Sequence, residues 1–183
     1  MILVDTPSWP WRGRLWGHMV SDTSLAELHS FAQGIGKRRI GFQGDHYDIN
    51  VEEHALAVEA GAISIDSREL VRRLRESGLR QRSKQELWTP VYQSNTVHSF
   101  ATLHEVISAT VTVADHQRRL QMVLSSAGQR PDALSVLVVE RPEEVAMVLE
   151  FLDQPDFDPT PIDLLVRGTK LDVDVVELII GNL

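Results

Sequence analysis

The chain has 183 residues, of which 43% are hydrophobic and 24% charged, a composition typical of a soluble globular protein with one large domain or two small ones. It contains no cysteine, which excludes disulfides and thiolate metal sites, so a metal would need His, Asp, Glu or backbone oxygen ligands. No apolar run approaches the roughly 20 residues of a membrane span, and no basic segment precedes an apolar one at the N-terminus. We therefore expect a soluble, cytoplasmic protein without a membrane partner.

The charge of the chain is unevenly distributed. The formal net charge is -8, but residues 1–84 hold 12 Lys and Arg against 11 Asp and Glu, whereas residues 85–183 hold 6 against 15. This asymmetry indicates two functionally different halves, and the acidic second half argues against nucleic acid as a partner. We expect a domain over residues 1–80, a connection over 81–101 and an acidic α/β region over 102–183.

The first half of the chain alternates short apolar runs with helical patterns. Strands are predicted over residues 1–4, 39–42 and 62–66, and the order β-α-β-α-β-α predicts a three-stranded parallel sheet. The carboxyl ends of parallel strands share one edge, where ligands bind, so the acidic groups that follow the three strands should meet there. The predicted helices cover residues 25–35, 51–60 and 68–76.

A tryptophan-rich stretch interrupts this pattern after the first strand. Trp9, Trp11 and Trp16 fall within residues 8–18, together with Pro10. We interpret this stretch as a loop that either closes over a pocket or packs back on the core.

The second half predicts a second small α/β region. Residues 102–127 favour one long helix, although β-branched residues within 106–113 also fit a strand. Strands are predicted over residues 134–139 and 162–166, and helices over 142–152, with Pro142 in the first turn, and over 172–180.

Several short motifs of the first half stand out together. In chain order they are Val4-Asp5, Gly17-His18-Met19-Val20-Ser21-Asp22, Glu27-Leu28-His29 and Gly44-Asp45-His46-Tyr47-Asp48. These motifs resemble an uncharacterised family of bacteria and phages, the domain of unknown function 4031. The resemblance covers about residues 1–80 and implies that the His-Tyr-Asp region is a site, without supplying an activity.

Imidazole and carboxylate groups in these motifs are candidate ligands of Mg, Mn or Zn. Such a metal could activate water for hydrolysis of a phosphate ester. The main candidates are Asp5, His18, Asp22 and His46, within a wider set that adds His29, Asp45 and Asp48. No recognised ligand spacing is present. The alternative is therefore structural: these residues cap helices, brace them and form local turns.

Cationic residues near the same region are candidates for binding a phosphate or another anion. Arg12, Arg14, Lys37 and Arg38 supply donors, and Trp16 and Tyr47 are further candidate ligand-binding residues. The two glycine-rich nucleotide-binding motifs, G-x-x-x-x-G-K-[ST] and G-x-G-x-x-G, do not occur in the chain. A solvated cationic turn remains the alternative for Lys37 and Arg38.

An acid/base pair without a metal is a further interpretation of these motifs, of which we call Gly44-Asp45-His46-Tyr47-Asp48 the central motif. A carboxylate beside an imidazole sets its tautomer and raises its pKa, as general acid/base catalysis requires. The candidate pairs are His46 with Asp45 or Asp48, and His18 with Asp22. The leading hypothesis is thus a site that binds or hydrolyses a phosphate-bearing ligand, with His46, Asp45 and Asp48 as catalytic candidates. The alternative is a non-catalytic regulatory module that binds a protein partner, and homo-oligomers fit either hypothesis.

Overall fold

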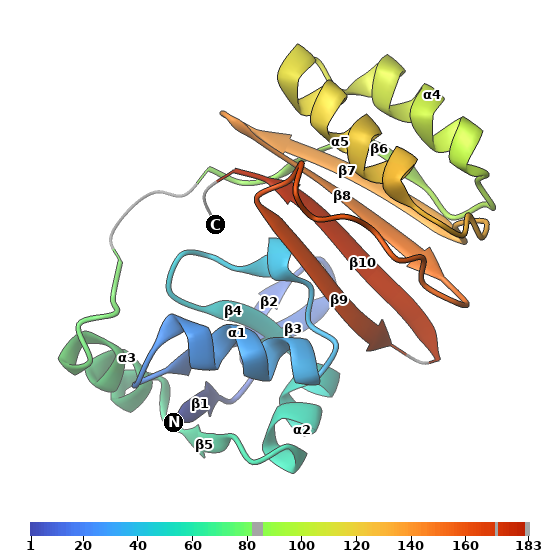
Figure 1. The fold of residues 1–183 in the computed structure, drawn as a ribbon. Coiled ribbons are helices and arrows are strands. Elements are labelled where there is room, and N and C mark those ends of the chain that lie inside the picture. The colour runs from blue at the N-terminus through green and yellow to red at the C-terminus, as the bar shows by residue number, and fades with distance from the viewer. Residues whose placement is uncertain (82–85, 171, 182–183) are drawn as a thin grey trace. The chain divides into compact units, whose positions relative to one another are not determined.

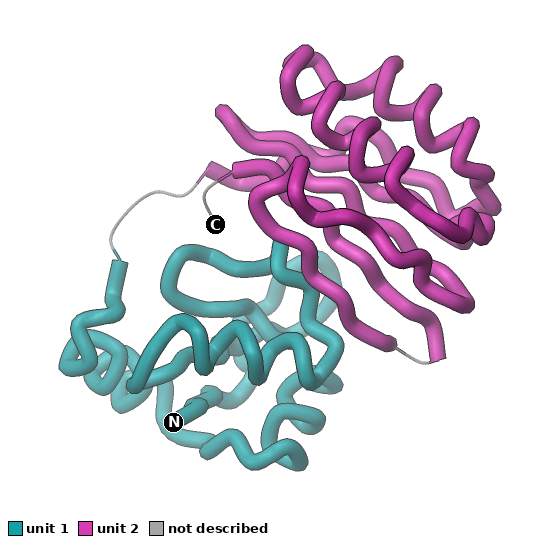
Figure 2. The backbone as a smooth tube through the Cα atoms, viewed as in Figure 1, with its two compact units in different colours: residues 1–85 teal, residues 86–183 magenta. Residues whose placement is uncertain are grey.

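The computed structural model describes residues 1–81, 86–170 and 172–181, and the chain divides into two compact units, residues 1–85 and 86–183 (Figure 2). Each unit combines helices with its own five-stranded sheet, which confirms the predicted mixed α/β class. Within the described residues, every helix is too short or too polar to cross a membrane.

Unit 1 is built around strand β3, whose two edges pair with different strands. The first strand β1 and the short strand β2 pair antiparallel with β3, as does β4, while β1 also pairs parallel with β5 (Figure 1). The elements of this unit are β1 (Ile2–Asp5), β2 (Trp9–Trp11), β3 (Arg14–Ser21), α1 (Leu25–Gly34), the 3-10 helix η1 (Arg39–Gly41), β4 (Tyr47–Asn50), α2 (Val51–Glu59), β5 (Ile63–Ile65) and α3 (Ser67–Glu76).

The expected three-stranded parallel unit is wrong, because the sheet of unit 1 is mixed. Its tryptophan-rich stretch, predicted to be a loop, is a β-hairpin. Arg12 and Gly13 form its two-residue turn with φ of 49° and 76°, the positive values of a type I′ turn. The usual signal for such a turn is Asn-Gly, so Arg-Gly did not reveal it.

The strand expected over residues 39–42 is also wrong, since η1 occupies most of it. The strand instead begins inside the motif, at Tyr47, because the chain reverses between Phe42 and Tyr47, which form an isolated bridge. Gln43 N donates to the carbonyl of His46 at 2.8 Å across this reversal, and Gly44 adopts a φ of 90°. The motif is therefore a tight turn that leads into β4.

The sheet of unit 1 buries side chains on both faces. One face packs against α1 and α2, and its core residues are Ile2, Val4, Met19, Leu28, Ala32, Tyr47, Ile49 and Ala57. The opposite face packs against α3, where the core residues are Leu3, Val20, Leu70 and Leu74. Successive residues of a strand point to opposite faces, so Asp5, His18 and Asp48 share the face of Leu3 and Val20.

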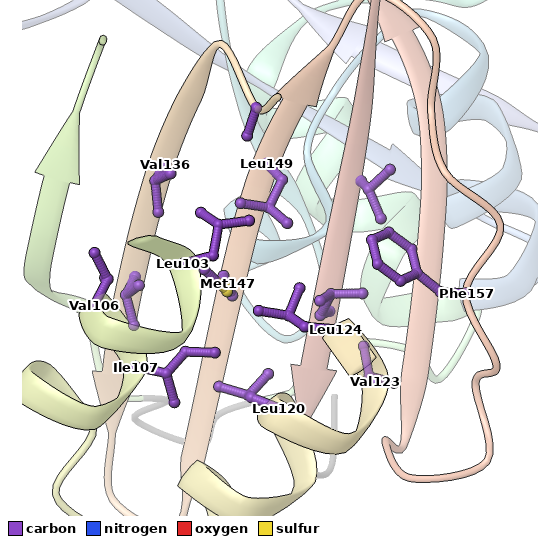
Figure 3. Packing of buried hydrophobic residues seen from close by; sticks show 14 of the residues in the cluster. Leu103, Val106, Ile107, Leu120, Val123, Leu124, Val136, Met147, Leu149 and Phe157 are labelled. Atoms are coloured by element: carbon purple, nitrogen blue, oxygen red, sulfur yellow. The ribbon is translucent and has the colours of Figure 1, made fainter. Parts of the chain in front are cut away.

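Unit 2 is an antiparallel sheet in the order β6-β7-β8-β10-β9, with α4 and α5 on one face (Figure 1). Leu103, Ile107, Leu120 and Leu124 of the two helices are fully buried together with Met147 of β8 (Figure 3). The elements are β6 (Thr89–Ser94), α4 (Phe100–Thr110), α5 (Ala114–Ser126), β7 (Ser135–Arg141), β8 (Glu144–Phe151), β9 (Leu164–Lys170) and β10 (Val173–Ile180).

Several predictions for the second half are wrong. The helices expected over residues 142–152 and 172–180 are strands β8 and β10, and Pro142 lies in the turn between β7 and β8 with Glu143 at a φ of 63°. The single helix expected over 102–127 is broken between α4 and α5, and the rival strand is absent there. The stretch 81–101, expected as a connection, contains β6.

Candidate functional site

Two histidines and an aspartate meet on the α3-side face of the unit 1 sheet. His18 of β3 and Asp48 of β4 are directly opposite each other in the antiparallel register, and His46 lies two residues before Asp48. One ligand atom from each of His18, His46 and Asp48 lies within 4.8 Å of the others. The two imidazole rings meet edge to face with centroids 5.3 Å apart. We call these three residues the His-His-Asp cluster.

Asp5 holds the first histidine of the cluster. Its Oδ2 lies 3.1 Å from Nδ1 of His18, and its Oδ1 accepts the backbone N–H of the same residue at 2.6 Å. The neighbouring Gly17 permits this approach, because a Cβ there would lie 2.7 Å from the carbonyl oxygen of Asp5. Asp5 itself is only 3% exposed, so the carboxylate is a fixed support for His18.

Asp45 holds the second histidine in the same way. Its Oδ1 lies 2.6 Å from Nδ1 of His46, and its Oδ2 accepts the backbone N–H of Gln81 at 2.9 Å. Arg80 lies 3.4 Å from the same Oδ2. The segment after α3 therefore returns to the cluster and neutralises a carboxylate that is 2% exposed.

The charges around His46 keep its imidazole protonated when no metal is present. Burial alone would lower the pKa of His46, but hydrogen bonds and charges from Asp45 and Asp48 outweigh burial and raise it to about 9. Burial alone would likewise raise the pKa of Asp5, Asp45 and Asp48, yet their contacts with the histidines lower all three. Ionised carboxylates thus contact both imidazoles of the cluster.

The orientation of both imidazoles matches that of metal-binding histidines. In each ring Nδ1 faces a buried carboxylate, which leaves Nε2 for a ligand, and Nε2 of His46 lies 3.4 Å from Oδ1 of Asp48. Metal-ligating histidines commonly give their other ring nitrogen to a carboxylate, which fixes the tautomer and the ring orientation. A dication bound by Nε2 of His18, Nε2 of His46 and the Asp48 carboxylate would replace the proton of His46.

The other candidate metal ligands lie elsewhere in unit 1. Asp22 pairs with Arg73 of α3 at 2.7 Å. Nδ1 of His29 lies 2.9 Å from the hydroxyl of Tyr47, and both residues pack on the face covered by α1 and α2. Tyr47, a candidate ligand-binding residue, is 1% exposed and points to the opposite face from Asp48.

The candidate cationic residues do not form one group. Lys37 Nζ lies 2.9 Å from Glu53 and 5.6 Å from the centroid of the Trp16 ring, and its charge contributes to lowering the pKa of Asp48. Arg38 caps η1 through its backbone. Arg12 and Arg14 belong to the β2–β3 hairpin, where Arg12 lies 4.5 Å over the Trp11 ring.

Sequence reasoning missed three residues that position the cluster. Gly17 was noted as part of a motif but not as the point where Asp5 approaches β3. Arg80 and Gln81, which contact Asp45, were assigned to the end of the domain and the start of the connection. A polar stretch 35 residues after Asp45 carries no local signal of that contact.

Comparison with known protein families finds one similarity, in the N-terminal segment. Residues 2–77 match the family model described as "Protein of unknown function (DUF4031)". This segment of unit 1 is therefore similar to that family. The match includes every member of the His-His-Asp cluster together with Asp5 and Asp45, and it ends before Arg80 and Gln81. No curated protein and no solved structure matches the chain.

Proposed function

We propose that unit 1 binds a divalent metal ion at the His-His-Asp cluster and uses it to bind and hydrolyse a phosphate-bearing ligand. The observation that carries the proposal is the paired arrangement of the two histidines, each with Nδ1 on its own buried carboxylate. A histidine that only braces the fold needs one hydrogen-bond partner. Two histidines held in this way and facing a third ligand instead match the surroundings of a metal centre.

The donor set favours Zn²⁺ or Mn²⁺ over Mg²⁺. Imidazole nitrogen suits Zn²⁺, whereas Mg²⁺ prefers oxygen ligands and retains several waters. Two imidazoles and one carboxylate are also the ligand set of non-haem Fe²⁺ oxygenases, so Fe²⁺ belongs among the ions to be tested. Three protein ligands leave coordination positions open for water and for a substrate oxygen.

The open positions support hydrolysis of a phosphate ester. A metal held by His18, His46 and Asp48 would supply a bound water that loses a proton more readily than bulk water, and such a water is the nucleophile that hydrolysis of a phosphate ester requires. The exposed fractions of His18, His46 and Asp48 side chains are 40%, 22% and 29%, so a ligand can reach the cluster from solvent. Lys37, close enough to lower the pKa of Asp48, adds positive charge for a phosphate.

Metal titration of two variants tests the metal site. His46→Ala removes a ligand, and Asp48→Asn removes a charge while keeping the shape of the side chain. We expect both to lose Mn²⁺ and Zn²⁺ binding in calorimetric titration while the melting temperature changes by only a few degrees, an effect on the order of 1 kcal/mol. His54→Ala on α2 and Asp66→Asn, which keeps the cap of α3, are matched controls that should bind as wild type does.

Three further outcomes would contradict all or part of the proposal. If the wild-type protein binds none of Zn²⁺, Mn²⁺, Mg²⁺ and Fe²⁺, the cluster is a structural ion network, and the alternative of a regulatory module that binds a protein partner is favoured. If the protein binds metal but releases no alcohol from a panel of phosphomonoesters and phosphodiesters, the metal site is supported and the proposed hydrolysis is contradicted. Selective binding of Fe²⁺ would point to oxygen chemistry instead.

A further inference from the structure

The β2–β3 hairpin places an aromatic surface on the same sheet face as the His-His-Asp cluster. Trp9 is directly opposite Trp16 in the register, and Trp11 is opposite Arg14. Trp16 precedes His18 by two residues on β3, so strand alternation puts the indoles on the cluster's face. Two residues along a strand span about 7 Å, so the aromatic surface begins about that far from His18.

Two of these indoles are exposed, although Arg12 lies 4.5 Å from the centroid of the Trp11 ring. The Trp9 and Trp11 rings are nearly parallel, with 11° between their planes and centroids 6.3 Å apart, and the residues are 50% and 46% exposed. Trp16 is already engaged, because Trp11 meets it edge-on and Lys37 lies over it. An exposed parallel pair can accept another flat ring on its outer face, as aromatic platforms do for nucleobases.

The charges around the hairpin favour a small anion over a polyanion. Arg12 and Arg14 are the cations of the hairpin itself, and residues 1–84 are nearly neutral, with 12 Lys and Arg against 11 Asp and Glu. Polynucleotide binding relies on many phosphate contacts from a basic surface. The neighbouring pocket, lined by Arg14, Leu15, Asn50, Val51 and Glu52, has a volume of about 180 Å³, whereas pockets that enclose a ligand measure roughly 300–1,000 Å³. A flat ring would therefore lie on the indoles and not inside this pocket.

We infer that the ligand of unit 1 is a mononucleotide, whose base stacks on Trp9 and Trp11 while its phosphate reaches the metal at the His-His-Asp cluster. This inference rests on the proposed metal site and deepens it by naming the ligand class. The hairpin recognises the base, and the cluster recognises the phosphate. Because stacking accepts any planar base, selectivity among the four bases is expected to be weak.

The test compares ligands with and without a base in the presence of Mn²⁺. Calorimetric titration of the full chain with AMP and with ribose 5-phosphate should show AMP binding about 5- to 150-fold tighter, the range that stacking of one base provides. Trp9→Ala and Trp11→Ala should remove this preference and leave the affinities for ribose 5-phosphate and Mn²⁺ unchanged. Trp88→Ala in unit 2 is the matched control and should keep the preference.

The arms of this experiment separate the two proposals. If the wild-type protein binds Mn²⁺ but binds AMP and ribose 5-phosphate with equal affinity, the stacking proposal is contradicted and the metal site is still supported. If the Trp9 and Trp11 variants are less stable but still bind AMP more tightly than ribose 5-phosphate, the two tryptophans contribute to packing and not to base recognition. A single-stranded oligonucleotide that binds far more tightly than AMP, with a steep salt dependence, would replace the mononucleotide by nucleic acid. If Mn²⁺ does not bind, separate titrations of the protein with adenosine and with ribose still test whether a base stacks on the indoles.

Discussion

At the scale of single residues, Gly17 determines whether Asp5 can hold His18. A Cβ at this position would lie 2.7 Å from the carbonyl oxygen of Asp5 and 2.8 Å from its Oδ1, and the carbonyl belongs to the backbone of β1. We expect Gly17→Ala to lower the free energy of unfolding by about 1–3 kcal/mol, as overpacking does, and to weaken Mn²⁺ binding. Denaturant titration and calorimetry measure the two effects. Gly34→Ala, where nothing lies within 4 Å, is the control; unchanged stability and affinity in Gly17→Ala would contradict the prediction.

His29 provides a pH-dependent prediction away from the cluster. Burial and the charge of Arg39 lower its pKa from 6.5 to about 4. Between these values the unfolded chain binds a proton that the folded chain does not, so the free energy of unfolding falls as the pH drops from 6.5 towards 4. The contribution of His29 amounts to at most about 3 kcal/mol. Denaturant titrations at several pH values should show that the free energy of unfolding decreases less with falling pH for His29→Gln than for wild type. If the free energy of unfolding depends on pH in the same way for both proteins, the pKa of His29 is not lowered by folding.

The sequence was sufficient to point to Asp5, His18, Asp45, His46 and Asp48, because ionisable residues directly follow or interrupt short apolar runs. The expected reason for their meeting was wrong. His18 and Asp48 meet as cross-strand neighbours of an antiparallel pair, not as groups at the ends of parallel strands. Gln81 could not be predicted at the site, because its contribution is a backbone N–H, which leaves no trace in residue type.

At the scale of elements, α4 and α5 differ in how their N-termini are capped. Ser99 caps α4 by accepting the N–H of Thr102, whereas Val113, at the N-cap of α5, forms no side-chain cap. We expect Val113→Asp to raise the free energy of unfolding of unit 2 by about 1 kcal/mol, because an N-cap carboxylate accepts a free backbone N–H. Ser99→Ala should lower it by about 0.5–2 kcal/mol in the same denaturant titration. A destabilised Val113→Asp would show that Val113 matters more for packing than for capping.

The element predictions failed where strands are apolar on both faces. Within β8, residues 145–149 are all buried, and so are residues 175–180 of β10. Such runs lack the two-residue alternation that distinguishes a half-exposed strand, and their length also suits a helix. The helices of unit 1 were predicted correctly because each carries a polar face and a capping residue, such as Asn50 in the capping box of α2.

At the scale of the whole molecule, the two units have separate cores, which permits separate unfolding. We expect calorimetry of the full chain to show that Mn²⁺ stabilises only the transition of unit 1, by about 2.7 kcal/mol at a free concentration of 100 times the Kd. His46→Ala should remove this shift and leave the transition of unit 2 in place. A Mn²⁺-induced shift of both transitions, or one that persists in His46→Ala, would place the ion elsewhere.

The contact of Asp45 with Gln81 and Arg80 joins the site to the segment that leads out of unit 1. Family similarity ends at residue 77, so a fragment cut there would keep all three proposed metal ligands but lose the partners of Asp45. The contacts of Asp45 thus extend a few residues beyond the end of the family similarity. Removal of Arg80 and Gln81 would leave the buried Asp45 carboxylate without these partners, and through Asp45 it would affect the orientation of His46.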